Sequence, residues 1–185
     1  MNAKLCRAAL AGLVALGCSN STGPLLTQGL DFLEWSATAP ALETYEFTFD
    51  AIAGTDQEEF IYYVGSGERF LRFRLDSATL VRDAAGDTLL FGESVPITVT
   101  VDSTRFIVKF QPEGLVFNPD RPADLNIVYN HADSIYLDRE AEIRPFRQET
   151  AGDPWEALLW TTWDTVADEI EIDVFGFTRY ALAVN

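Results

Sequence analysis

Hydrophobic and polar residues alternate along most of this chain with a period of two. Tyr45, Phe47 and Phe49, for example, are separated by Glu46 and Thr48. This alternation predicts β-strands with one buried face and one face in solvent. The same pattern predicts further strands over residues 71–75, 95–101, 106–110, 125–129 and 170–174.

Short clusters rich in glycine, proline, asparagine and aspartate separate these segments. They lie at residues 53–56, 65–67, 83–87, 112–114, 118–120 and 151–154. Such residues favour turns, because they tolerate or stabilise the backbone conformations that turns require. Many short strands joined by turns are typical of a β-sandwich or barrel. We therefore predict an all-β fold, an antiparallel β-sandwich, in a single domain over residues 31–185.

Two segments near the end of the chain break the simple pattern. Residues 155–160 are mostly apolar and fit either a helical turn or a strand, and we favour a strand that forms a hairpin with residues 144–148. Residues 177–184 alternate large and small side chains, which predicts a hydrogen-bonded strand near the centre of the sandwich. Gly176 interrupts the preceding alternation, so we expect a β-bulge there.

The first 17 residues have the pattern of an export signal. Lys4 and Arg7 are followed by the apolar run 8–16, which is interrupted only by Gly12. A transmembrane helix needs roughly 20 apolar residues, so this run is too short. Its length fits the apolar region of a cleaved signal peptide, and we predict that residues 1–17 are such a peptide.

The residues that lead to Cys18 add a second motif to this signal. Residues 15–18, with the sequence ALGC, resemble the bacterial lipobox, whose cysteine receives diacylglycerol and becomes the new N-terminus. We therefore predict that Cys18 is lipidated and that residues 18–30 form a flexible tether. Ser19 replaces the aspartate that retains many Gram-negative lipoproteins in the inner membrane. By this resemblance, we expect an exported protein that is anchored to the cell envelope, and we favour the outer membrane over the inner membrane as its location.

Charge narrows the possible partners. The sequence has 185 residues, with 29 aspartates and glutamates against 13 lysines and arginines, and a formal net charge of −16. Binding to nucleic acid or to an anionic membrane requires a basic surface, so this composition argues against both. The expected link to the membrane is therefore the lipid, and dual acylation provides the stable anchoring that one chain does not.

Cysteine usage limits the chemistry of the domain. The only cysteines are Cys6 and Cys18, which lie in the predicted signal and at the predicted lipidation site. Residues 31–185 therefore contain no thiol for a disulfide, a cysteine nucleophile or a cysteine-based zinc site. The domain must be stabilised by its hydrophobic core.

The second half of the chain resembles a bacterial ZU5-like β-domain. The residues that carry the resemblance are 112–117 (PEGLVF), 125–129 (LNIVY), Trp155 and 176–181 (GFTRYA). Gly176 and Thr178 replace the family's histidine and serine, and the resemblance covers roughly residues 69–184. The resemblance implies a β-sandwich fold. It also implies a function as an interaction or scaffold module.

No catalytic constellation is evident. His131 is the only histidine, no G-x-S-x-G motif accompanies it, and we expect it in a polar loop. Paired carboxylates could hydrolyse a glycoside if they lay about 5–9 Å apart. The candidates are Glu140, Glu142, Glu149, Asp153, Glu156, Asp164, Asp168, Glu169, Glu171 and Asp173. Alternation places Glu169, Glu171 and Asp173 on the solvent face of one strand, which is also the ordinary place for charged residues.

Two kinds of binding site remain open. Asn118, Asp120 and Asp124 are weak calcium candidates, because loop oxygens of this kind bind Ca²⁺, although no complete calcium-loop motif is present. Asp83 and Asp87 are a second such group. The four tryptophans could form an aromatic platform for sugars or could simply pack in the core; they are Trp35, Trp155, Trp160 and Trp163.

These patterns favour a binding or structural protein over an enzyme, with no cofactor expected apart from a possible calcium ion. The expected partner is an unidentified protein or glycan. An envelope carbohydrate-binding protein and a carboxylate-based hydrolase are the alternatives. An exposed concave site with two inward carboxylates would favour the hydrolase.

Overall fold

The structure is a computed structural model, and it describes residues 29–184. The predicted signal peptide, Cys18 and nearly all of the tether lie outside the described residues, so those predictions are untested. The described chain is nearly all β, as the alternation predicted. Its strands form two antiparallel sheets, an arrangement consistent with a β-sandwich.

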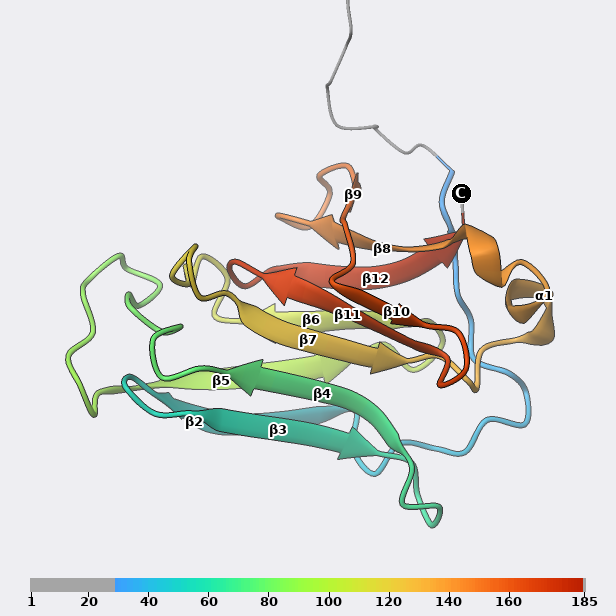
Figure 1. Cartoon of the computed structure of the whole chain (residues 1–185), viewed down its shortest axis with the longest axis horizontal. Helices are drawn as coiled ribbons and strands as arrows, with labels where there is room; N and C mark the ends of the chain where they lie inside the picture. Colours follow the sequence, from blue (N-terminus) through green and yellow to red (C-terminus); the bar gives the residue numbers. More distant parts are fainter. Residues whose placement is uncertain (1–28, 185) are drawn as a thin grey trace, which may run out of the picture.

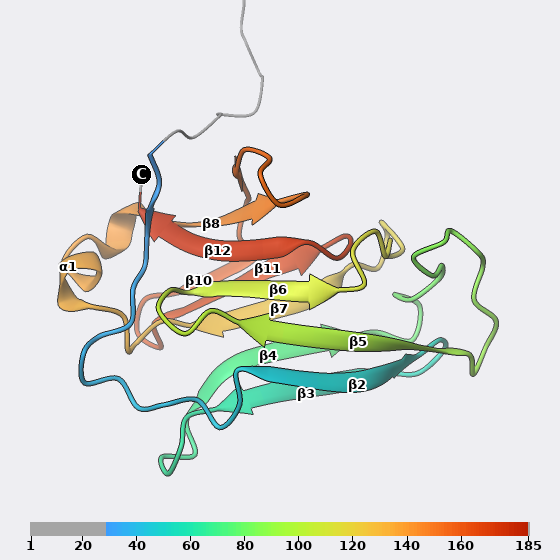
Figure 2. The same cartoon turned by 180° about the vertical axis from the view of Figure 1, so that it is seen from behind.

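One sheet has seven strands and the other has five. The larger sheet runs in the order β2 (Glu46–Ile52), β5 (Ser94–Val101), β6 (Ile107–Gln111), β12 (Arg179–Val184), β8 (Ile143–Gln148) and β9 (Glu156–Ala157), with β1 (Asp31–Phe32) also paired to β12. The smaller sheet runs in the order β10 (Thr162–Asp164), β11 (Glu169–Val174), β7 (Ala123–Val128), β4 (Arg69–Leu75) and β3 (Gln57–Tyr62). Figure 1 looks onto the five-stranded sheet, and Figure 2 looks onto the seven-stranded sheet.

The core lies between the two sheets and is rich in phenylalanine. The rings of Phe73 on β4 and Phe110 on β6 lie 4.9 Å apart, so they join the two sheets directly. Phe177 stacks on Phe110 at 5.1 Å and meets Phe117 edge-on at 5.0 Å. Aromatic pairs of this kind stabilise a core beyond the area that they bury. This packing is consistent with a domain that has no disulfide.

The predicted hairpin near the end of the chain is present but short. β9 pairs with β8 only through Ala157 opposite Phe146 and Glu156 opposite Arg147. Residues 158–160 are neither strand nor helix. The structure also contains a short helix, α1 (Ser134–Leu137), and a 3-10 turn at Glu140–Glu142, which the alternation did not predict.

The prediction of a bulge at Gly176 was wrong. β11 ends at Val174 in the five-stranded sheet, and β12 begins at Arg179 in the seven-stranded sheet, so the chain crosses between sheets here. The change of alternation marks this crossing. A Cβ atom on Gly176 would lie 2.7 Å from the Leu115 carbonyl oxygen, so this close approach requires glycine. The prediction that residues 177–184 contain a central strand was correct, because β12 lies between β6 and β8.

Candidate functional site

The outer face of the five-stranded sheet carries opposite charges on two strands separated by a third. Alternation places Arg72 and Arg74 outward on β4 and three carboxylates outward on β11. Arg69 reaches the same face although it has the parity of the core residues, because the pairing of β3 with β4 shifts register next to it. β7 lies between these two strands and is paired with both. The outward charged residues are Arg69, Arg72 and Arg74 on β4, and Glu169, Glu171 and Asp173 on β11.

At one end of this face the charges are fully paired. Arg69 Nη2 lies 2.7 Å from Glu169 Oε2, and Arg72 Nη2 lies 2.6 Å from Glu171 Oε2. Asn126 on β7 is completely buried between the first pair. Its Oδ1 accepts a hydrogen bond from Arg69 Nη2 at 3.2 Å, and its Nδ2 donates to Glu169. We call these five residues the paired end.

At the other end of the same face the charges do not pair in this way. Asp124 on β7 lies directly opposite Asp173 on β11 and directly opposite Arg74 on β4. Arg74 Nε lies 3.8 Å from Glu58 Oε1 instead. Among residues 29–184, neither Asp124 nor Asp173 forms a side-chain hydrogen bond or an ion pair. Asp173 therefore repels Asp124 from one neighbouring strand, while Arg74 attracts it from the other.

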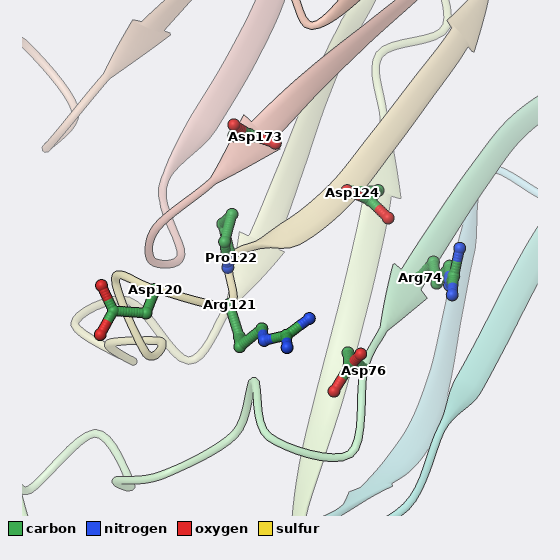
Figure 3. A pocket seen from close by; sticks show the side chains of 7 residues that line it. All are labelled: Arg74, Asp76, Asp120, Arg121, Pro122, Asp124 and Asp173. Atoms are coloured by element: carbon green, nitrogen blue, oxygen red, sulfur yellow. The ribbon is translucent and has the colours of Figure 1, made fainter.

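These residues line an open recess of about 370 Å³, which we call the acidic recess. Figure 3 shows the Arg121 side chain extending toward the space between Asp76 and Asp124. The strands bring the residues together, because β4 ends just before Asp76 and β7 begins just after Arg121. The lining residues are Arg74, Asp76, Asp120, Arg121, Pro122, Asp124 and Asp173.

The surroundings of Asp124 oppose its negative charge. Burial raises the pKa of the Asp124 carboxyl above its usual value, and the facing Asp173 acts in the same direction. Arg74 partly offsets both effects by lowering that pKa. A positively charged group that entered the acidic recess would therefore stabilise the ionised form of Asp124.

The predicted calcium candidates are only partly brought together. Asp120 and Asp124 both line the acidic recess, but Asn118 does not. The Asn118 side chain instead holds a turn, because its Oδ1 accepts from the Asp120 backbone N–H and its Nδ2 donates to the Ala78 carbonyl. Among residues 29–184, no group of three or more histidine, cysteine, aspartate or glutamate side chains is arranged to hold a metal ion.

The second calcium candidate, Asp83 with Asp87, also forms a turn. Asp83 Oδ1 accepts hydrogen bonds from the backbone N–H groups of Ala85 and Asp87, at 2.9 Å and 2.8 Å. His131 lies in the loop after β7, as expected, and its Nε2 is 3.1 Å from Glu68 Oε2. Its ring meets the buried Tyr63 ring edge-on at 4.5 Å. These contacts explain the positions of Asp83 and His131 without a ligand.

The tryptophans are dispersed over the described chain rather than gathered in one platform. Trp35 packs on Phe106 with ring centroids 4.0 Å apart, and Trp160 meets Trp163 edge-on at 5.4 Å. Trp163 Nε1 also donates to the Tyr129 hydroxyl at 2.9 Å. Trp155 lies at the outer face of the seven-stranded sheet, where it contacts Phe32 at 5.1 Å.

Most of the acidic recess could not be recognised in the sequence. Arg74, Asp76 and Arg121 are separated from Asp173 by at least 52 positions, and no short motif connects them. The sequence indicated only that Asp124 and Asp173 lie on the solvent-facing side of their strands. Which strands are neighbours is decided by the topology, and the alternation does not encode it.

Among residues 29–184, no helix has the length and apolar character needed to cross a membrane. Comparison with known proteins gives no match: no protein-family model, no curated protein and no solved structure matches this chain.

Proposed function

We propose that the chain is a lipid-anchored envelope protein whose domain is a ZU5-like β-sandwich that binds a protein partner and does not catalyse a reaction. The two antiparallel sheets support this kind of fold. The segments that carry the ZU5 resemblance also contact each other. The Phe177 N–H donates to the Leu115 carbonyl at 2.9 Å, and the Phe117 N–H donates to the Phe175 carbonyl at 3.0 Å. These segments therefore have a structural role, which suits a scaffold or interaction module.

The facing carboxylates of Asp124 and Asp173 are the observation that carries this proposal. Arg74 offsets the repulsion at Asp124, but burial still disfavours the charge of this carboxylate, and a cation from a partner would stabilise it. The recess around them is open and contains four aspartates and two arginines. The matching partner surface presents lysine or arginine side chains, with a carboxylate that reaches Arg121. Complementary charges of this kind give specificity and fast association.

A binding experiment with a basic peptide tests this proposal. The full-length protein in detergent is titrated with a tetralysine peptide, and tetraglutamate serves as the probe of opposite charge. Replacement of both Asp124 and Asp173 by asparagine should weaken tetralysine binding about tenfold, since each exposed charge contact contributes up to about 1 kcal/mol.

The matched control is Asp50→Asn, which removes one exposed carboxylate on β2, in the other sheet. This variant should bind tetralysine nearly as tightly as the unmodified protein. If Asp50→Asn and Asp124→Asn weaken binding equally, the overall charge binds the peptide and the recess proposal is wrong. The same conclusion follows if the double variant retains full affinity.

The anchor is tested separately, because it lies outside the described residues. Cys18→Ser should leave uncleaved precursor and should abolish metabolic labelling with a fatty-acid analogue. Labelling that persists in this variant contradicts lipidation at Cys18. Membrane fractionation of the labelled protein then tests the expected outer-membrane location.

One observation favours a carboxylate-based hydrolase as the second candidate. Two facing carboxylates, one of them with a raised pKa, can serve as general acid and base, and Asp124, whose pKa is raised, faces Asp173. Turnover of a glycan that disappears in both Asp124→Asn and Asp173→Asn would support this function. It would also replace the binding proposal for the acidic recess.

A further inference from the structure

A second recess lies on the opposite side of the molecule, on the outer face of the seven-stranded sheet seen in Figure 2. Lys109 on β6 and Arg179 on β12 lie directly opposite each other there. Both alternate with core residues, Val108 and Tyr180, so both point outward. The recess has a volume of about 250 Å³, and we call it the Trp155 recess after one of its walls. Its lining residues are Thr100, Asp102, Ile107, Lys109, Trp155 and Arg179.

This pair of facing cations is unexpected in so acidic a chain. Lys4 and Lys109 are the only lysines in the sequence, so the single lysine of the described domain faces an arginine. Like charges in directly opposite positions destabilise an antiparallel pair. An anion bound between them would remove this repulsion.

The two cations differ in whether a carboxylate of the protein already neutralises their charge. Lys109 Nζ lies 3.3 Å from Glu113 Oε1 in the turn that follows β6. The Arg179 guanidinium donates only to the neutral Gln148 Oε1, at 3.4 Å. Among residues 29–184, no carboxylate lies within ion-pair distance of Arg179. Its planar donors therefore remain available to a carboxylate or phosphate.

The far end of the recess has the opposite character. Asp102 Oδ1 accepts hydrogen bonds from the Thr104 backbone N–H at 2.8 Å, from Thr104 Oγ1 at 2.7 Å and from the Arg105 N–H at 3.0 Å. Partial burial disfavours the charge of Asp102, but these hydrogen bonds outweigh it and lower the pKa of the carboxyl. Asp102 therefore stays ionised at neutral pH and can accept hydrogen bonds from a ligand.

Apolar surface joins the two ends. The indole of Trp155 and the side chain of Ile107 line the same recess as the cations and Asp102. Phe32 contacts Trp155 edge-on at 5.1 Å and helps to fix the position of the indole. A flat aromatic wall of this kind suits the C–H face of a ring-shaped ligand.

We propose that the Trp155 recess binds an acidic sugar unit, that is, a pyranose ring that carries a carboxylate. The carboxylate pairs with Arg179 and Lys109, the ring packs on Trp155, and the hydroxyl groups donate hydrogen bonds to Asp102. This inference goes beyond the proposed function and does not depend on it, because the acidic recess belongs to the other sheet. A failure of either proposal leaves the other intact.

Lys109 provides a nearly unique probe for the test. Reductive methylation with ¹³C-formaldehyde labels lysine amines and keeps their charge, so the Lys109 signal of the full-length protein can be followed by NMR. Lys109→Arg identifies that signal. Glucuronic acid should shift it saturably with a dissociation constant on the order of 1 mM, which is typical of a small ligand with few contacts. Glucose, which has the same ring without the carboxylate, should leave it unchanged.

Three variants locate the binding. Arg179→Gln and Trp155→Ala should each weaken glucuronic acid binding at least tenfold, while Arg179→Lys should recover part of the affinity. The control Arg82→Gln removes an arginine in the loop between β4 and β5 and should have no effect. An unchanged free energy of unfolding of the variants, measured by chemical denaturation, shows that their fold is intact.

Inorganic phosphate and glucuronate-bearing glycolipid vesicles complete the experiment. If phosphate shifts the Lys109 signal at the same concentrations as glucuronic acid, the recess binds simple anions and the sugar assignment is wrong. Shifts with glucose, or no saturable shift with glucuronic acid, also overturn it. Equal occupancy by free glucuronic acid and by the vesicles identifies the sugar unit as the recognised group. Binding to vesicles alone shows that the recess recognises a lipid surface, and this would contradict the proposal.

Discussion

The paired end and the acidic recess lie on the same three strands and the same face. At the paired end the charged side chains form ion pairs, whereas Asp124 and Asp173 in the acidic recess form none within the described chain. The difference begins with the residue that β7 supplies. Asn126 carries an amide, which can donate to Glu169 and accept from Arg69 at the same time. Asp124 carries a carboxylate, which can only accept when it is ionised. The amide therefore joins Arg69 and Glu169 into one network, whereas the carboxylate joins no such network among the described residues at the other end.

The largest expected effect comes from breaking the paired end. Asn126→Leu keeps a side chain of similar size but removes hydrogen bonds to two charged groups in a fully buried position. We expect the free energy of unfolding to fall by about 2 kcal/mol, as measured by chemical denaturation. A loss below about 0.5 kcal/mol would show that Arg69 and Glu169 are stable without the amide.

A smaller effect of opposite sign is expected at the acidic recess. Asp124→Asn gives this end the same amide as the paired end and removes the cost of a partly buried charge, which exceeds the attraction to Arg74 that is lost with it. We expect the protein to become more stable by up to about 1 kcal/mol, in the same denaturation assay. The control Asp50→Asn removes an exposed carboxylate from the other sheet and should change stability by less. Destabilisation by Asp124→Asn would mean that the carboxylate is compensated in the free protein.

The free energy of unfolding should also depend on pH through Asp124 in the acidic recess. Because the pKa of Asp124 is raised in the folded protein, the folded state holds this proton more tightly than the unfolded state. Stability from this group is therefore present at low pH and is lost as the pH rises through the folded pKa. The advantage of Asp124→Asn over the unmodified protein should accordingly grow between about pH 3 and pH 6. A difference that stays constant or shrinks over this interval would contradict the raised pKa.

Salt should give the smallest effect and should separate the two ends again. Raising the ionic strength from about 0.1 M to about 1 M shortens the screening length from about 10 Å to about 3 Å. The stability gained by Asp124→Asn should then grow by a few tenths of a kcal/mol, because salt screens the attraction of Asp124 to Arg74 and Arg72, which exceeds its repulsion from Asp173 and Asp76. The loss caused by Asn126→Leu should persist, because short hydrogen bonds in a buried position are hardly screened. Equal salt dependence of both variants would argue against this distinction.

Most strands of the fold were predictable from alternation, but β1, β3 and β10 were not, and neither were the neighbours of each strand. Each predicted segment gave a strand, because the pattern of Leu71, Phe73 and Leu75 or of Ile170, Ile172 and Val174 fits a sheet with one buried face. The crossing at Gly176 was mistaken for a bulge, since both features interrupt the alternation. Only the later pairing of β12 with β6 and β8 distinguishes them.

The candidate sites were predictable only in part for the same reason. Alternation placed Asp173 in solvent, but it could not show that Asp124 faces it from the neighbouring strand. Nor could it show that Arg179 faces Lys109, which lies 70 positions earlier in the sequence. Residues that meet across strands depend on topology and register, and these are set by the packing of the whole core.

The central position of β12 also has a consequence for the order of events during folding. Without residues 179–184, the path of the seven-stranded sheet falls into two separate parts, β2-β5-β6 and β8-β9. Each part would expose an unpaired edge, and such edges readily pair with other chains. During synthesis the sheet closes only after a late segment becomes available, so folding is dominated by contacts between distant positions and is expected to be slow. Until β12 inserts, the edges of β6 and β8 that it later covers are open to pairing with other chains.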